Sequence, residues 1–199
     1  RYLKAISPTF DAIRRATAEI KSARGDQRLR VTAPQSLAVR WLTPRLPGFR
    51  RRHPEIDLEI DVSTDITGEH ADGYDVGIFL SRGPWPHHHV ESLMPISVFP
   101  VCSPAVGNNI HTISDLASQT LLHVRQLPNA WPEWFRAAGA DQQTAGKEIF
   151  FNDVQLAYEA ALNGLGVAIG ADVVVADYLR NGELVDPIGP HVKSAFQYH

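Results

Sequence analysis

Apolar residues in the first 24 positions recur at alternating steps of three and four, a spacing that places them on one stripe of a helix. Charged residues lie off this stripe, and Gly25 ends the predicted helix. Two interpretations are open: a surface helix packed on its own domain, or a helix that pairs with another chain. In the second, the dimerisation residues are Leu3, Ile6, Phe10, Ile13 and Ile20.

After Gly25 the pattern changes to one of strands and helices. Residues 28–33 and 56–62 alternate polar and apolar side chains, as strands do, and 75–79 has the composition of a short buried strand. Apolar residues at helical spacing between the first two strands predict a helix from Ser36, which two prolines bend or restart. The order strand–helix–strand predicts a parallel sheet with right-handed crossovers.

A second α/β unit follows an apolar, extended segment at residues 92–102. Its predicted strands are 120–123, 148–151 and 167–169, and its predicted helices are 112–116, 131–138, 154–163 and 172–181. Two similar units joined by an extended crossing segment predict an α/β fold of two lobes with a hinged cleft.

Composition narrows the class of protein. The chain has 199 residues, of which 44% are hydrophobic and 21% charged, as in an ordinary globular protein. The formal net charge of -3 disfavours direct DNA binding by this segment, because such surfaces are basic. No apolar run approaches the about 20 residues of a membrane span, and no secretory signal is recognisable. The single Cys102 fits a reducing compartment, and a buried structural thiol is a commoner role than a reactive one.

Motifs for catalysis and metal binding are missing from the sequence. It contains no nucleophile elbow, phosphate loop, metalloprotease helix or cysteine cluster, so we predict that it is not an enzyme. His87, His88 and His89 are adjacent and point in different directions, which favours a solvent loop over a metal site. We therefore predict no metal and no cofactor.

Several segments, in this order and spacing, resemble the effector domain of LysR-type transcriptional regulators, in the branch of the glycine-cleavage and β-lactamase activators. The resemblance covers about residues 1–199. The segments are APQSLAVRWLTPRL at 33–46, FRRRHPEIDL at 49–58, GYDVGI at 73–78, WPEWF at 131–135 and NGLGVAI at 163–169.

This resemblance implies a two-lobed fold like that of type 2 periplasmic binding proteins, preceded by a linker helix. The implied parts are 1–26 as linker and dimerisation helix, 27–101 plus 192–199 as regulatory lobe I, and 102–191 as regulatory lobe II. A DNA-binding winged helix-turn-helix would precede Arg1, and a further strand and helix would follow His199. The implied protein is a cytoplasmic bacterial homodimer or homotetramer that senses a small-molecule effector and contacts DNA only through its head.

Ligands of open α/β sheets bind beyond the carboxyl ends of strands. We predict a small, anionic effector bound near such strand ends by Gln35, Ser36, Leu37, Thr64, Val101, His123, Asn152 and Asp153, and the resemblance adds Phe196. At Ser36 two interpretations are open: a helix N-cap alone, or a hydroxyl beside backbone N–H groups that bind an anion. At Thr64, His123 and Asp153, ordinary local hydrogen bonding competes with ligand binding.

The resemblance adds roles at four positions. Ser36 aligns with a hydroxyl residue that contacts the effector in the family, and Phe196 with an aromatic site residue. Asn152 is an amide where the β-lactamase-activator branch has a carboxylate, and Val154 stands where that branch has a hydroxyl. These departures predict a different effector for this chain.

Two other classes of protein fit the pattern. A transporter's solute-binding protein shares the fold, but it has no use for the first helix and normally carries a signal peptide. A pure dimerisation module with an empty cleft is the third interpretation, and it differs from the first in binding no small molecule.

Overall fold

The computed structural model describes residues 28–63, 73–83, 89–140 and 146–199. The chain divides into two compact units: unit 1 comprises residues 1–95 and 195–199, and unit 2 comprises residues 96–194. The predicted heptad stripe of Leu3, Ile6, Phe10, Ile13 and Ile20 lies outside the described residues, as do Thr64, His87 and His88.

Unit 1 is built on a three-stranded sheet in the order β2-β1-β3. Its strands are β1 (Arg28–Pro34), β2 (Asp57–Ser63) and β3 (Val76–Gly77). β1 pairs in parallel with both neighbours, which confirms the predicted parallel sheet. The apolar side chains of β1 at positions 29, 31 and 33 are buried, because alternate residues of a strand point to one face.

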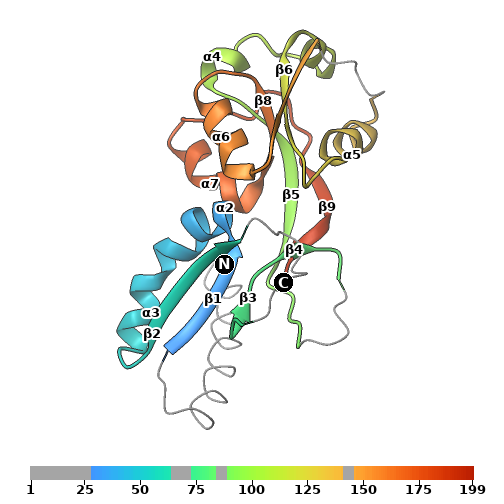
Figure 1. The fold of residues 1–199 in the computed structure, drawn as a ribbon. Helices are drawn as coiled ribbons and strands as arrows, with labels where there is room; N and C mark the ends of the chain where they lie inside the picture. Colours follow the sequence, from blue (N-terminus) through green and yellow to red (C-terminus); the bar gives the residue numbers. More distant parts are fainter. Residues whose placement is uncertain (1–27, 64–72, 84–88, 141–145) are drawn as a thin grey trace. The chain divides into compact units, whose positions relative to one another are not determined.

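The crossover from β1 to β2 is one helical stretch in four pieces. They are α2 (Gln35–Leu37), a wide turn η1 (Ala38–Leu42), a tight turn η2 (Thr43–Arg45) and α3 (Leu46–Arg52). The irregular turns stand where Pro44 removes a backbone donor, which confirms that the prolines interrupt the predicted helix. Trp41 and Phe49 are buried, and α3 runs along β1 and β2 in Figure 1.

The second sheet has six strands in the order β4-β9-β5-β8-β6-β7. The strands are β4 (Leu80–Ser81), β5 (Met94–Val101), β6 (Thr120–Val124), β7 (Lys147–Phe151), β8 (Val167–Ala171) and β9 (Val192–Tyr198). β6 pairs in parallel with β7 and β8, whereas β5 runs antiparallel to β8. The boundary between the two units falls within β5 and within β9, so these strands carry the chain from one unit to the other.

Helices of unit 2 lie on two sides of its strands (Figure 1). They are α4 (Pro104–Gly107), η3 (Ile113–Ser118), α5 (Ala130–Ala137), α6 (Val154–Leu162) and α7 (Asp172–Arg180). On the side of α5, an aromatic cluster of Trp131, Trp134 and Phe135 packs with Leu121 and Val167. The indole N–H groups of this cluster are satisfied, since Trp131 donates to Leu122 O at 3.1 Å and Trp134 to Pro190 O at 3.2 Å.

The single thiol is part of this core. Cys102 is 0% exposed and its backbone exchanges hydrogen bonds with Val185. Burial, together with the nearby Asp186 carboxylate, raises the pKa of the Cys102 thiol to about 11. The thiol is therefore protonated at neutral pH, which agrees with a structural role rather than a reactive one.

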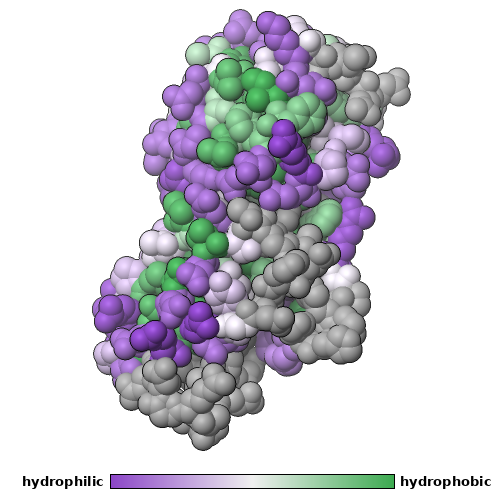
Figure 2. Space-filling view, in the orientation of Figure 1, coloured by the Kyte–Doolittle hydropathy of each residue, from purple (hydrophilic) through white to green (hydrophobic). Residues whose placement is uncertain are grey.

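Surface composition is ordinary for a globular protein. Figure 2 shows mostly hydrophilic side chains on the visible face, with apolar groups on both units. No helix of the described residues combines the length and apolar composition that crossing a bilayer demands.

Gly166 offers a test of how closely β8 approaches β6. A Cβ at Gly166 would collide with the Thr120 carbonyl oxygen, which is backbone and cannot move aside cheaply. We expect Gly166→Ala to lower the free energy of unfolding in urea by about 1–3 kcal/mol. Gly48→Ala is the control, because the nearest atom to its Cβ is the Arg51 side chain at 3.9 Å. A Gly166→Ala midpoint equal to that of wild type would contradict the packing.

Candidate functional site

Three predicted site residues of unit 1 follow the carboxyl end of β1. The strand ends at Pro34, and Gln35, Ser36 and Leu37 form the first turn of the helical stretch. The Gln35 side chain is exposed, Ser36 is 4% exposed and Leu37 is 0% exposed. Leu37 is thus a core residue, and only its backbone could meet a ligand.

The helix begins one residue earlier than the sequence predicted, so the interpretation of Ser36 as the N-cap is wrong. The cap position is Pro34, whose extended backbone (φ -56°, ψ 139°) leads into the helix without a side-chain cap hydrogen bond. A proline has no side-chain acceptor, so no capping side chain occupies the N–H groups of this first turn. Ser36 lies inside the turn rather than at its cap.

Phe196 lies on β9, within unit 1. Its ring is half-buried, and the Arg82 guanidinium carbon stands 4.5 Å from the ring centroid. The sequence singled out Phe196 but gave no reason to place Arg82 beside it.

The other predicted residues that the structure describes lie in unit 2, and they differ in burial and in hydrogen bonding. Val101, at the end of β5, is 0% exposed and belongs to the core. Asn152, which follows β7, is exposed. Asp153 is the N-cap of α6: its Oδ1 accepts from the backbone N–H groups of Gln155 at 2.8 Å and Leu156 at 3.3 Å. This local hydrogen bonding accounts for the residue type at Asp153 without a ligand.

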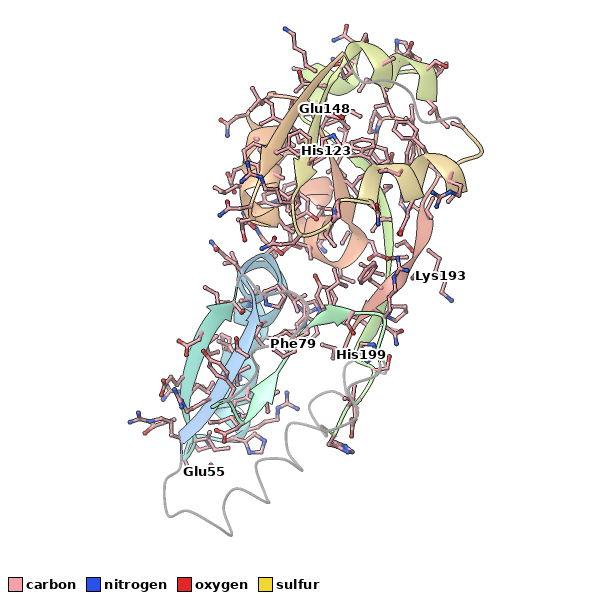
Figure 3. All side chains as sticks on the ribbon, turned by 45° about the vertical axis from the view of Figure 1, so that its right-hand side comes forward. Glu55, Phe79, His123, Glu148, Lys193 and His199 are labelled. Carbon is pink, nitrogen blue, oxygen red and sulfur yellow. The ribbon has the colours of Figure 1, made fainter. Side chains whose placement is uncertain are left out.

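His123 lies on β6 in a small cluster that the sequence did not reveal. Its ring stacks on Phe150 with centroids 4.7 Å apart, and its Nε2 is 3.2 Å from Glu148 Oε1. Figure 3 labels His123 and Glu148 on the neighbouring strands β6 and β7. Burial lowers the pKa of His123, while the Glu148 carboxylate acts in the opposite direction. Phe150 is 52% exposed, so the cluster opens to solvent.

Strand register explains why this cluster was missed. β6 and β7 pair so that His123 stands opposite Phe150, and Glu148 is two residues away on the same face. Alternation along 148–151 hinted at a strand face shared by Glu148 and Phe150, but only the pairing shows which residue of β6 they meet. In the described parts of the chain, no group of three or more His, Cys, Asp or Glu side chains is placed to hold a metal ion.

Comparison with known proteins decides the family. Residues 22–199 match the family described as the LysR substrate binding domain. The chain belongs to the LysR substrate-binding domain family. This LysR domain is 32% identical over 189 residues to the transcriptional activator AmpR of Rhodobacter capsulatus, covering 95% of the chain and 65% of that protein. It is equally similar, at 32% over 189 residues, to the glycine cleavage system transcriptional activator of Escherichia coli K12, with 94% and 62% covered.

A solved structure extends the likeness to the fold. The effector domain of the transcriptional regulator AmpR of Pseudomonas aeruginosa is 31% identical, with a TM-score of 0.76 over 86% of this chain and 82% of that one. The LysR domain thus has the predicted two-lobed, periplasmic-binding-protein-like α/β fold. The chain spans about two thirds, 62–65%, of the length of these curated relatives. Because they are named as regulators, the prediction that the chain is not an enzyme is confirmed, and the transporter alternative is not favoured.

The surroundings of His123 predict a pH dependence of stability. Its pKa is lowered from 6.5 in the folded LysR domain, so the unfolded chain binds the proton more readily. The stability that the neutral imidazole contributes is present above about pH 6.5 and is lost as the pH falls below it. We expect His123→Phe to reduce the fall in the free energy of unfolding between about pH 7.5 and 5, measured by urea titration. His89→Gln is the control, because the His89 side chain is 89% exposed. A His123→Phe profile with the slope of wild type would contradict this assignment.

Proposed function

We propose that this chain is the small-molecule effector-sensing and oligomerisation domain of a LysR-type, DNA-binding transcriptional regulator of the cytoplasm. The observation that supports this most strongly is the likeness to the AmpR effector domain, in both sequence and fold. In this proposal the domain contacts DNA only through a head domain, since its own net charge of -3 suits a nucleic acid poorly.

The effector, in our proposal, binds beside Ser36 in unit 1. Two observations support this position. The hydroxyl lies in a first helical turn that no side chain caps, and oriented N–H groups of this kind attract anions. The residues before and after Ser36 differ in exposure: Gln35 is open to solvent and Leu37 is fully buried, so Ser36 sits where the surface meets the core.

Phe196, also in unit 1, would supply an apolar surface for the effector. Asn152, in unit 2, stays a separate prediction; its exposed side chain is an amide that both donates and accepts. We rank His123 and Asp153 lower, because packing and capping already account for them, and Thr64 stays a prediction.

Signal transmission would follow from differential affinity. An effector that binds one conformational state of the regulator more tightly shifts the population toward that state. In a dimer or tetramer, such a shift moves the DNA-binding heads, whose half-sites are about one helical turn apart. Small changes in subunit geometry then alter operator binding.

Replacing Ser36 tests the site. The effector is first identified by calorimetric titration with small carboxylates and amino acids. We expect Ser36→Ala to weaken its binding by about tenfold or more, because a hydrogen bond to a charged group contributes about 1.5–3 kcal/mol. Ser36→Thr, which keeps a hydroxyl, should bind more tightly than Ser36→Ala. Ser103→Ala is the matched control, since Ser103 is another buried serine, 7% exposed, in unit 2. Equal affinities for wild type and Ser36→Ala would exclude this site.

Self-association through the N-terminal stripe has its own test. Polar substitution of both Ile6 and Ile13 should raise the dimer dissociation constant in sedimentation velocity, because the pair lies on the proposed apolar seam. Substitution of the off-stripe pair Lys4 and Asp11 by alanine is the control. An unchanged sedimentation coefficient for the isoleucine variant at all concentrations would refute pairing through this helix.

A further inference from the structure

Arg82 stands beside Phe196 in unit 1, where the short ladder between β4 and β9 ends. Ser81 pairs with Gln197 in the last step of this ladder, so the next position of the register brings Arg82 opposite Phe196. The guanidinium carbon of Arg82 lies 4.5 Å from the centroid of the phenyl ring. On this side of β9, Phe196 therefore meets the Arg82 side chain one position beyond the last pair of the ladder.

The backbone is held on both sides of Arg82. At the other end of the ladder, Phe79 and His199 exchange backbone hydrogen bonds of 3.1 and 3.0 Å (Figure 3). Directly after Arg82 the chain turns at Gly83, which has a φ of 63° and donates its N–H to Ser81 Oγ at 2.9 Å. These bonds, all within unit 1, fix the point from which the Arg82 side chain extends over the ring.

A cation over one face of an aromatic ring stabilises one orientation of that ring. Phe196 is half-buried, so part of its side chain remains accessible to a ligand. A side chain that is already held in its bound orientation loses less conformational freedom when a ligand packs on it. Arg82 has a further partner of its own, so we assign it no hydrogen bond to the effector. Its effect on binding would pass through the ring.

We propose that Arg82 is a positioning residue that holds the Phe196 ring ready to receive an apolar group of the effector. The effector is then a small acid that carries an apolar group. This inference rests on the proposed function, in which Phe196 supplies an apolar surface for the effector. It adds the residue that acts through Phe196 and the chemical class of the group that Phe196 contacts.

A second stacked arginine in unit 1 provides a matched control. Arg45 lies over the Trp41 ring at 4.5 Å, the same separation as in the Arg82 pair. Trp41 is 7% exposed, so its ring belongs to the core and is not a proposed contact of the effector. Substitution of Arg45 by glutamine thus removes an equivalent stacking contact and the same charge without touching Phe196.

The test uses acids that differ only in their apolar group. The whole chain is titrated calorimetrically with glycine, alanine, valine, leucine and phenylalanine, and with straight-chain carboxylates from acetate to hexanoate. We expect the affinity of the wild type to rise with the size of the apolar group. Arg82→Gln should weaken the tightest acid by about two- to fivefold and leave the smallest acid that binds unchanged. Arg82→Lys, which keeps a cation, should recover part of this loss, and Arg45→Gln should bind as the wild type does.

A double-mutant cycle separates positioning from a merely structural role. If Arg82 acts through Phe196, Arg82→Gln should leave the affinity unchanged in a chain that already carries Phe196→Leu. A residue with a structural role alone would lower the midpoint of thermal unfolding without changing the affinity for any acid. Thermal unfolding of each variant therefore accompanies its titration.

The outcomes distinguish this inference from the proposed function. An equal loss of affinity from Arg82→Gln with and without Phe196→Leu would overturn the positioning role, as would an equal loss in Arg45→Gln. If a compound without an apolar group binds most tightly and depends on Ser36, the proposed class of effector is wrong and the proposed function survives. If no acid of either series binds the wild type, this class is also overturned, and the Ser36 test with other compounds decides the proposed function.

Discussion

Parallel strands cannot be joined by a tight turn, and each pair needs a crossover that packs back on the sheet. In unit 1 the crossover between β1 and β2 is the helical stretch of residues 35–52, held by Trp41 and Phe49. In unit 2 the segment between β7 and β8 is α6. This constraint brings the carboxyl end of a strand next to the start of a helix, and it thereby determines where Ser36 and Asn152 lie.

The elements themselves were predictable wherever a local pattern reports burial. The alternation of residues 28–33 and the helical spacing of 154–163 correspond to β1 and α6, with ends that differ by one residue or little more. β4 was not predicted, because two residues carry no periodicity and the strand exists only through pairing with β9. The cap of the first helix was misplaced for a related reason: Ser36 has the composition of an N-cap, but the strand–helix junction at Pro34 sets the helix start.

Contacts that depend on strand register account for most of what the sequence could not give. His123 meets Phe150 and Glu148 across the β6–β7 pair, and Arg82 meets Phe196 across the β4–β9 pair. Periodicity says which face a residue takes, whereas the partner on the neighbouring strand follows from a pairing of distant segments. The LysR resemblance pointed to Phe196 alone and carried no information about the arginine that stacks on it.

Several candidate residues have structural roles, which leaves fewer of them to contact the effector. Asp153 caps α6, and Leu37 and Val101 belong to the core. Recognition in our account therefore depends on Ser36 and Phe196, both within unit 1. Differences from relatives at such positions, together with those at Asn152 and Val154, are where a different effector would be selected.

A crystal of the chain soaked with small carboxylic and amino acids tests the central claim most directly. The account predicts ligand density within hydrogen-bonding distance of the Ser36 hydroxyl. Well-ordered ligand density elsewhere in the chain, with none beside Ser36, would contradict it.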